Sequence, residues 1–228
     1  MSRMRIIHTS AINTAYRTPW AREHLEDYYV KLAHKDGYRC RSAYKLLELQ
    51  QRFHLLKPNI SVIDLGASPG SWSQVAADII FKTHRQLNNT LIAVDIQPID
   101  HINNVTVLSG HDMTLDTTRD KIKSLLPSGV EVVMSDMAPS PTGIKDIDNH
   151  KIIELCRIAM SLAKDVLVDD GAFVCKVWQS SLSDKLQKEL SDSFKSTQLV
   201  TTKATKKGSR EKYIVSRGFK VLGRGKYL

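Results

Sequence analysis

The sequence contains few cysteines and no long apolar segment, and both shortages narrow the class of protein. Only three cysteines occur in 228 residues, Cys40, Cys156 and Cys175, and they lie far apart in the chain. Their odd number argues against a disulfide framework, and the lack of a C-x-x-C pair argues against zinc. No apolar run approaches the roughly 18 residues that a membrane span needs. We expect a protein of a reducing compartment, with no metal site and no membrane span.

Two common nucleotide-binding patterns are also missing. The segment 61–74, SVIDLGASPGSWSQ, has the glycine spacing G-x-x-x-G with Pro69 inside it, rather than G-x-G-x-x-G, and no Gly-Lys-Ser/Thr phosphate loop occurs. Its pattern instead predicts a strand, a tight turn and a helix over 71–81. Such a turn can bring backbone amides close to a nucleotide-like ligand, or it can simply connect a strand to a helix. The segment alone leaves both interpretations open.

Acidic residues are outnumbered by basic ones, 24 to 33, which gives a net charge of +9 and a pI of about 9.4. This excess favours a polyanionic partner such as a nucleic acid, although a mildly basic enzyme would show it too. The first acidic residue is Glu23. Residues 1–19 carry arginine and many hydroxyl groups, which is typical of a mitochondrial transit segment and also of a basic arm on RNA. We expect one domain over 20–218 and a tail over 219–228.

Strand and helix patterns alternate along the rest of the chain. Apolar runs predict strands that begin near Val62 and at 90–95, 105–108, 130–135, 172–177, 198–202 and 211–216; helical spacing predicts helices over 20–33, 42–54, 71–81, 149–167 and 183–194. This alternation predicts an α/β fold with a mostly parallel, doubly wound sheet. Asp64, Asp95 and Asp136 lie at or near strand carboxyl ends, so we expect them to meet at the ligand-binding edge.

Several polar residues stand out against this frame. Asp95 can accept both hydroxyls of a ribose, and Asp112 can accept a hydrogen bond from an adenine amino group. Lys176 lies inside an apolar run, so it belongs either to an exposed edge strand or to a functional site. Glu211 begins another apolar run after a basic stretch, and Lys45 interrupts a helix face, where lysines usually extend to solvent.

Five motifs together resemble the FtsJ/RrmJ family of S-adenosylmethionine-dependent RNA 2′-O-ribose methyltransferases. They are RSAYKL at 41–46, DLGASPGSWSQ at 64–74, SDMAP at 135–139, FVCKVW at 173–178 and SREKY at 209–213. They occur in the family's order, and the resemblance covers about residues 20–218. Ser68 and Ser71 depart from the family's usual Ala and Gly or Ala. The resemblance implies a Rossmann-like sheet of seven strands, the last antiparallel, with helices on both faces.

The resemblance also assigns roles to residues. It places a catalytic Lys-Asp-Lys-Glu set on Lys45, Asp136, Lys176 and Glu211, with Lys176 either a base or the group that orients the hydroxyl. It places S-adenosyl-L-methionine on Gly66, Pro69, Gly70, Ser71, Trp72, Asp95, Asp112 and Asp136. We expect RNA phosphates to contact a set of basic residues, namely Arg39, Arg41, Lys145, Lys203, Lys206, Lys207 and Arg210.

The implied partner is large-subunit rRNA or a pre-ribosomal particle. The loop 136–148 and the segment 20–25 resemble the mitochondrial form of the bacterial large-subunit enzyme, so we expect an A-loop uridine as target and a monomer. We expect a location in the mitochondrial matrix, or in the cytoplasm if the chain is of the bacterial type. Three alternatives stay open: a tRNA 2′-O-methyltransferase, a non-catalytic ribosome-assembly factor with the same fold, and a small-molecule methyltransferase. The charge and the match through Lys45 and Glu211 argue against the last.

Overall fold

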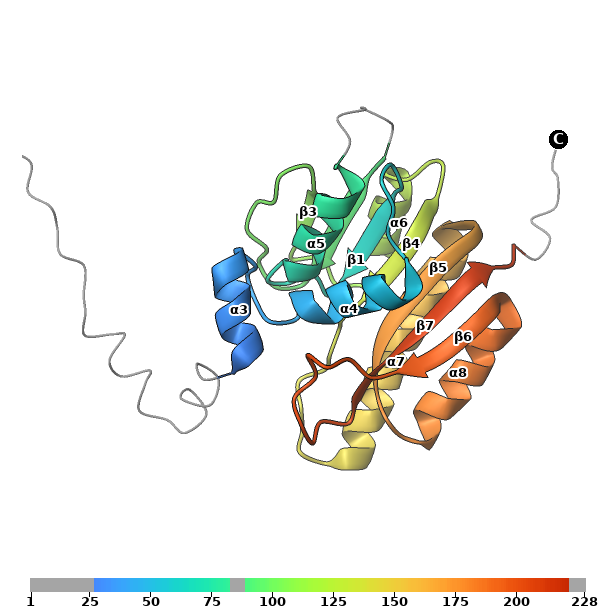
Figure 1. Ribbon diagram of the computed structural model, residues 1–228. Helices are drawn as coiled ribbons and strands as arrows, with labels where there is room; N and C mark the ends of the chain where they lie inside the picture. Colours follow the sequence, from blue (N-terminus) through green and yellow to red (C-terminus); the bar gives the residue numbers. More distant parts are fainter. Residues whose placement is uncertain (1–26, 83–88, 222–228) are drawn as a thin grey trace, which may run out of the picture.

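A computed structural model describes residues 27–82 and 89–221, which form one seven-stranded sheet with helices on both faces (Figure 1). The strand order is β3-β2-β1-β4-β5-β7-β6, with β7 antiparallel to both neighbours and the other described pairs parallel. The strands are β1 (Val62–Leu65), β2 (Leu91–Asp95), β3 (Thr106–Ser109), β4 (Val130–Ser135), β5 (Leu167–Trp178), β6 (Phe194–Val200) and β7 (Glu211–Phe219). The predicted doubly wound α/β fold and its antiparallel last strand are confirmed.

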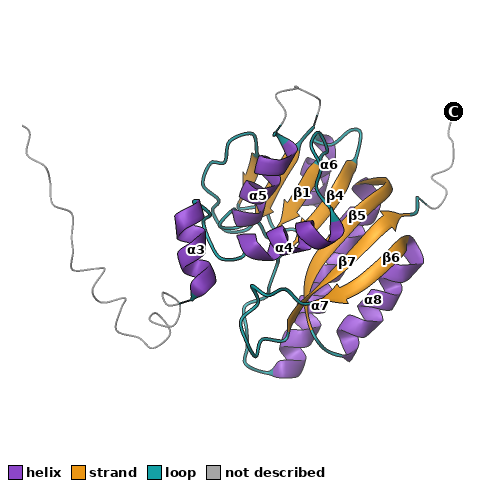
Figure 2. Cartoon of the chain, viewed as in Figure 1, coloured by secondary structure: helices purple, strands orange, loops and turns teal. Residues whose placement is uncertain are grey.

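The helices divide between the two faces of the sheet (Figure 2). They are α3 (Tyr28–Asp36), α4 (Ala43–Phe53), α5 (Ser71–Ile80), α6 (Asp116–Ser124), α7 (Lys145–Val166) and α8 (Ser181–Ser193). Buried side chains of α4 and α5 form a core with one face, while those of α6, α7 and α8 form a larger core with the other. Helix α3 packs on α4, where Tyr29 and Tyr44 stack at 5.5 Å between ring centroids. Of the helices in the described ranges, none is both long and apolar enough to cross a membrane.

Some element boundaries differ from the predicted ones. Helix α6 was not predicted, because Thr118 and Ile122 are the buried residues of an otherwise polar segment. Phe194 was expected in a helix and instead begins β6, because it pairs in register with Phe219 and their rings pack 5.2 Å apart. Strand β5 begins at Leu167, and β7 runs to Phe219, one residue into the expected tail.

The start of two helices also differs. Helix α7 begins at Lys145 rather than 149, because the Asp148 carboxylate accepts hydrogen bonds from the turn before it. Helix α3 begins at Tyr28 and extends to Asp36, where Gly37 closes it in a left-handed conformation. Residues 20–26 of the helix predicted over 20–33 lie outside the described residues, as do residues 1–19.

The topology creates a crevice at one edge of the sheet. Strand β1 lies between β2 and β4: the chain runs from β1 to β2 and β3 on one side and then crosses to β4 on the other. Ligands of doubly wound sheets bind at this point, beyond the carboxyl ends of the strands. Of the three carboxylates expected to meet there, Asp95 at the end of β2 and Asp136 after β4 line the same cavity, and Gly66 after β1 lines it with them. Asp64 does not line this cavity, because it lies inside β1 and is fully buried.

Candidate active site

Two lysine–carboxylate pairs form the polar centre of the site. Lys176 Nζ lies 3.1 Å from Asp136 Oδ1 and also donates to the main-chain oxygen of Asp136. Lys45 Nζ lies 2.6 Å from Glu211 Oε1. All four side chains are less than one fifth exposed. The structure therefore pairs the four residues that the sequence assigned to catalysis, which come from α4, the end of β4, β5 and β7.

Strand register explains how these residues meet. Lys176 lies opposite Tyr213 in the antiparallel pair of β5 and β7, so their side chains share one face of the sheet. Glu211 lies two residues before Tyr213 and therefore points to the same face. Helix α4 covers this face and carries Lys45. Because β5 lies between β4 and β7, Lys176 is not on an edge strand. Of the two interpretations of this lysine, an exposed edge strand is therefore excluded and a functional site is left.

Tyr213 is a member of the site that the sequence analysis did not assign. Its hydroxyl lies 2.8 Å from Asp136 Oδ1 and 3.3 Å from Glu211 Oε1, so its single hydrogen is shared between the two carboxylates. The side chain is fully buried. Burial, followed by the charges of Asp136 and Glu211, raises the pKa of Tyr213 well above its ordinary value, so the hydroxyl stays a donor. Its spacing of two from Glu211 in a strand was the signal that could have found it.

A cavity of about 700 Å³ opens beside Asp136 at the carboxyl edge of the sheet. Of the predicted cofactor residues, Gly66, Asp95, Asp112 and Asp136 line it. The sequence analysis did not assign most of the remaining wall, which comprises Ser68, Val94, Ile96, Gln97, His111, Met113, Thr114, Met137, Ala138, Pro139, Ser140, Lys151, Glu154, Leu155 and Ile158. The volume is within the usual range for a small-molecule site.

The carboxylates in the cavity are held in place and keep room to accept. Asp95 accepts from the backbone N–H of Ser68 at 2.9 Å and of Gln97 at 2.8 Å, one on each oxygen. Asp112 accepts from the backbone N–H and hydroxyl of Thr114 through one oxygen, and these bonds lower the pKa of Asp112. A carboxylate has about four acceptor positions, so both side chains can still bind hydroxyl or amino donors of a ligand.

The turn after β1 is closely packed against the loop after β4. Gly66 has φ +71°, and a Cβ there would lie 2.4 Å from Cγ of Met137. The Gly66 position therefore excludes any larger residue while its backbone faces the cavity. A nucleoside that bears a short charged chain fits this set of groups. The set comprises the Asp95 carboxylate at the end of β2, the Asp112 carboxylate after β3 and the backbone turn after β1.

The other predicted cofactor residues do not line the cavity. The buried Trp72 donates through Nε1 to the Ser42 oxygen at 2.9 Å, and Ser71 is buried too, its hydroxyl accepting from the Cys40 N–H at 2.8 Å. Gly70 has φ +114° and lies under the Arg39 guanidinium. Pro69 accepts from that guanidinium through its main-chain oxygen at 2.7 Å. These four residues shape and anchor the turn behind the cavity.

The basic residues expected on RNA fall into two groups. Arg39 donates to the main-chain oxygens of Pro69, Asp100 and His101, and Arg41 pairs with Asp27 and donates to the Ala204 oxygen. Both guanidinium groups are therefore engaged within the protein, which departs from the expectation that they contact phosphates.

The second group lies at the start of α7 and in the loop between β6 and β7. Lys145 is exposed at the start of α7, and Lys203, Lys206 and Lys207 are exposed in the loop between β6 and β7. Arg210 is half-buried and donates to Asn149 Oδ1 at 3.2 Å, which ties the loop to α7.

Asp64 on β1 is a fully buried carboxyl with one partnered oxygen. Ser73 donates to its Oδ2 at 2.7 Å, whereas Oδ1 has no partner among the described residues. Burial raises the pKa of Asp64 to about 7; the bonds from Ser73 oppose this rise, and the nearby charges of Asp136 and Asp95 add to it.

Comparisons with known proteins agree with this geometry. Residues 38–219 match the model of the family described as FtsJ-like methyltransferase. A curated protein of Acinetobacter baylyi, named Ribosomal RNA large subunit methyltransferase E, is 41% identical over 202 residues, which cover 88% of this chain and 91% of that protein.

Solved structures give the same picture. A Plasmodium falciparum structure described as a ribosomal RNA methyltransferase superposes with a TM-score of 0.70 at 28% identity, over 80% of this chain and 98% of that one. A Streptococcus mutans methyltransferase in complex with SAH superposes with a TM-score of 0.50 at 12% identity, over 76% of this chain and 97% of that one, a likeness of fold alone.

The buried Asp64 carboxyl makes the stability of the folded protein depend on pH in a testable way. Its carboxyl has a pKa of 3.8 unfolded and about 7 folded, so between these values the folded state binds more protons. The free energy of unfolding should therefore fall as pH rises, by up to about 1.4 kcal/mol per pH unit, with no further loss above about pH 8. Asp64→Asn should lack this component. Urea unfolding of both proteins at several pH values measures it; parallel curves would contradict the assignment.

Proposed function

The chain belongs to the FtsJ-like methyltransferase family, and from this membership and the site we propose that it methylates the 2′-hydroxyl of a ribose in large-subunit ribosomal RNA. The observation that carries the proposal is the meeting of the pairs Lys176–Asp136 and Lys45–Glu211 beside the cavity. A small-molecule methyltransferase needs a methyl-donor cavity, but it has no evident need for two lysines at its open side or for a net charge of +9.

The cofactor that fits the cavity is S-adenosylmethionine, which supplies a methyl group on a positively charged sulfur. Asp95 would accept from its ribose hydroxyls and Asp112 from its adenine amino group, with Ile96 and Met113 as apolar walls. Asp136 would lie next to its charged portion. The family membership supports this choice, and a neighbour of the same fold has been solved with SAH.

The two lysines compensate for the low reactivity of the ribose hydroxyl. A 2′-hydroxyl is a weak nucleophile, so holding it in line with the methyl group supplies much of the rate. Lys176 is fixed by two contacts to Asp136, so its Nζ can hold the hydroxyl oxygen and stabilise the negative charge that develops as the proton leaves. Lys45 is fixed by Glu211 and adds a second positive charge on the same face.

Several observations support an rRNA substrate. The relative at 41% identity is named for the large ribosomal subunit, and lysines are exposed at the start of α7 and in the loop that leads to Glu211. We propose an A-loop uridine as the target. A tRNA target is the second candidate; it shares the chemistry and the basic surface. A non-catalytic assembly factor would not need all four charged residues in two buried pairs.

We also propose a mitochondrial location. It rests on residues 1–19, which lie outside the described residues and combine arginine and hydroxyl side chains without an acid. A bacterial relative that covers most of the chain supports a substrate of the bacterial type of ribosome.

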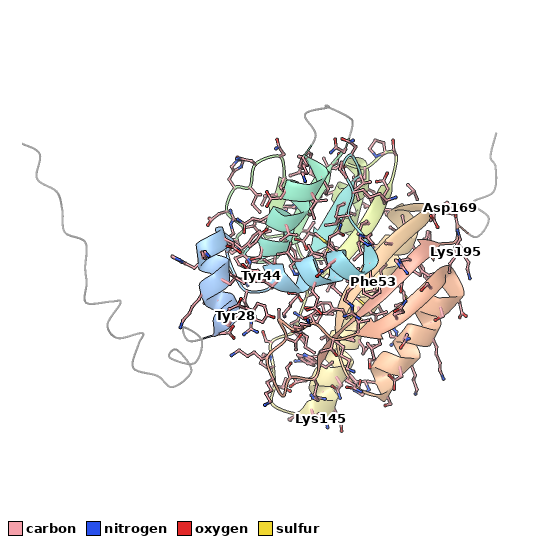
Figure 3. All side chains as sticks on the ribbon, in the orientation of Figure 1. Tyr28, Tyr44, Phe53, Lys145, Asp169 and Lys195 are labelled. Atoms are coloured by element: carbon pink, nitrogen blue, oxygen red, sulfur yellow. The ribbon has the colours of Figure 1, made fainter. Side chains whose placement is uncertain are left out.

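Lys176→Ala should lower kcat by about 10²- to 10⁴-fold, because it removes the group that contacts the hydroxyl. The dissociation constant for S-adenosylmethionine, measured by calorimetry, should stay within about twofold, because Lys176 does not line the cavity. Lys195→Ala is the matched control, because Lys195 also pairs with an aspartate, Asp170. Its side chain is 63% exposed, and it lies far from Lys145 at the start of α7 (Figure 3). A Lys176→Ala enzyme with normal turnover would overturn the assignment.

Tyr213→Phe should lower kcat by about tenfold or more, since it removes a hydrogen bond that positions two charged groups. Tyr44→Phe is a closely matched control, because Tyr44 also donates to a carboxylate, that of Asp36 at 2.6 Å, outside the site. Single-turnover rates with RNA compare the two variants. Equal rates would show that the shared hydrogen has no part in positioning Asp136 and Glu211.

Mapping 2′-O-methyl groups in rRNA and tRNA, with and without the protein, tests the substrate. We expect loss of one uridine mark in the A-loop of the large-subunit rRNA, in mitochondrial ribosomes where the cell has them. Loss of a tRNA mark alone would replace the rRNA proposal with the second candidate, and loss of a cytosolic mark would contradict the proposed location.

A further inference from the structure

One face of α7 lines the cavity and continues past it towards the start of the helix. Lys151, Leu155 and Ile158 contribute to the cavity wall. Ile147 lies four residues before Lys151, and Ile144 lies three residues earlier at the N-cap position, so both fall on the same stripe of the helix. Four helical residues span about 6 Å, so Ile147 is close to the cavity's edge.

These two isoleucines are exposed although most apolar residues of α7 are buried in the sheet interface. Ile144 is 57% exposed and Ile147 is 44% exposed. A single exposed apolar residue is ordinary. Two on one stripe, contiguous with the wall of the site, form an apolar surface that nothing in the described part of the chain covers.

The backbone that presents them is fixed. The Asp148 carboxylate accepts from the N–H and hydroxyl of Thr142 at 2.8 and 2.6 Å and from the N–H of Gly143 at 3.2 Å. The Thr142 hydroxyl in turn accepts from the N–H of Ile144 at 3.2 Å. The isoleucines are therefore held before any partner arrives, which lowers the entropy lost on binding.

The surroundings favour an anionic partner. Lys145 lies between the isoleucines in sequence, at the end of α7 marked in Figure 3. The lysine-bearing loop between β6 and β7 lies beside this end in Figure 1, and the bond from Arg210 to Asn149 ties it there. Asp146 offsets part of the charge. An apolar surface next to exposed lysines suits a strand with apolar bases and a charged backbone.

We propose that Ile144 and Ile147 form a platform that contacts an unstacked nucleobase next to the target nucleotide. This inference rests on the proposed RNA methyl transfer and adds the form of the substrate. A nucleotide whose ribose must enter this site cannot keep its base stacked in a helix, so the neighbouring base loses a stacking partner and exposes one face. The platform lets the protein select an unpaired loop over a duplex by contact with a base.

The test compares Ile144→Ser/Ile147→Ser with wild type on two RNA probes, a hairpin with an unpaired loop and the fully paired duplex of the same stem. We expect about a tenfold loss of affinity for the loop hairpin, because apolar contact with a base is removed. Duplex affinity and the salt dependence of binding should stay unchanged, because no charge is altered. Leu115→Ser, at a residue 53% exposed at the N-cap of α6, is the matched control for loss of an exposed apolar side chain.

Each other outcome contradicts the inference in a distinct way. Unchanged loop affinity would remove the platform. An equal loss on both probes would show contact with the backbone rather than with a base. A change of sedimentation coefficient in the double variant would identify the stripe as a surface for a second copy of the chain. If wild type bound and methylated neither probe nor ribosomal RNA, the proposed function itself would fail, whatever the variants do.

Discussion

The hydroxyl of Tyr213 is the point at which the two charged pairs of the site meet. Each carboxylate binds its own lysine, and the one hydrogen of Tyr213 lies between them. Buried ion pairs contribute little net stability, because desolvation offsets their attraction. An arrangement of two such pairs on one face is therefore better explained by the placement of two positive charges than by folding. The lysines can keep fixed positions at the edge of a cavity because their counter-ions are themselves held.

The chain topology makes this arrangement possible. Strand β7 returns antiparallel between β5 and β6, which sets Tyr213 opposite Lys176 and brings Glu211 to the same face. Helix α4, from the other end of the described chain, packs over that face with Lys45. The cavity, by contrast, is built from the turns after β1, β2, β3 and β4 and from one face of α7. In the proposed function, methyl-donor binding and the handling of the hydroxyl would use different parts of one sheet, and Asp136 would belong to both.

Much of this could be predicted from the sequence, because periodicity and motif order report on strands and on groups at strand ends. Asp95 and Asp136 were expected at a common edge and line one cavity there together with Asp112, whereas Asp64, expected at the same edge, is buried inside β1. The sequence could not report the features that depend on packing. Trp72 and Ser71 resemble ligand residues in a motif, yet their side chains face the protein interior. Arg39 and Arg41 resemble RNA-binding residues, yet their guanidinium groups donate to main-chain oxygens, and Arg41 also pairs with Asp27. Tyr213 has no charge that would mark it in the sequence as a site candidate, and its role depends on distances across three elements.

The most direct test of this account is a crystal structure of the protein with S-adenosylhomocysteine and an oligoribonucleotide that contains the target site. The account predicts the nucleoside in the cavity with its ribose at Asp95, and the target 2′-oxygen within hydrogen-bond distance of Lys176 Nζ. A 2′-oxygen bound away from both Lys176 and Lys45, with the nucleoside still in the cavity, would contradict it.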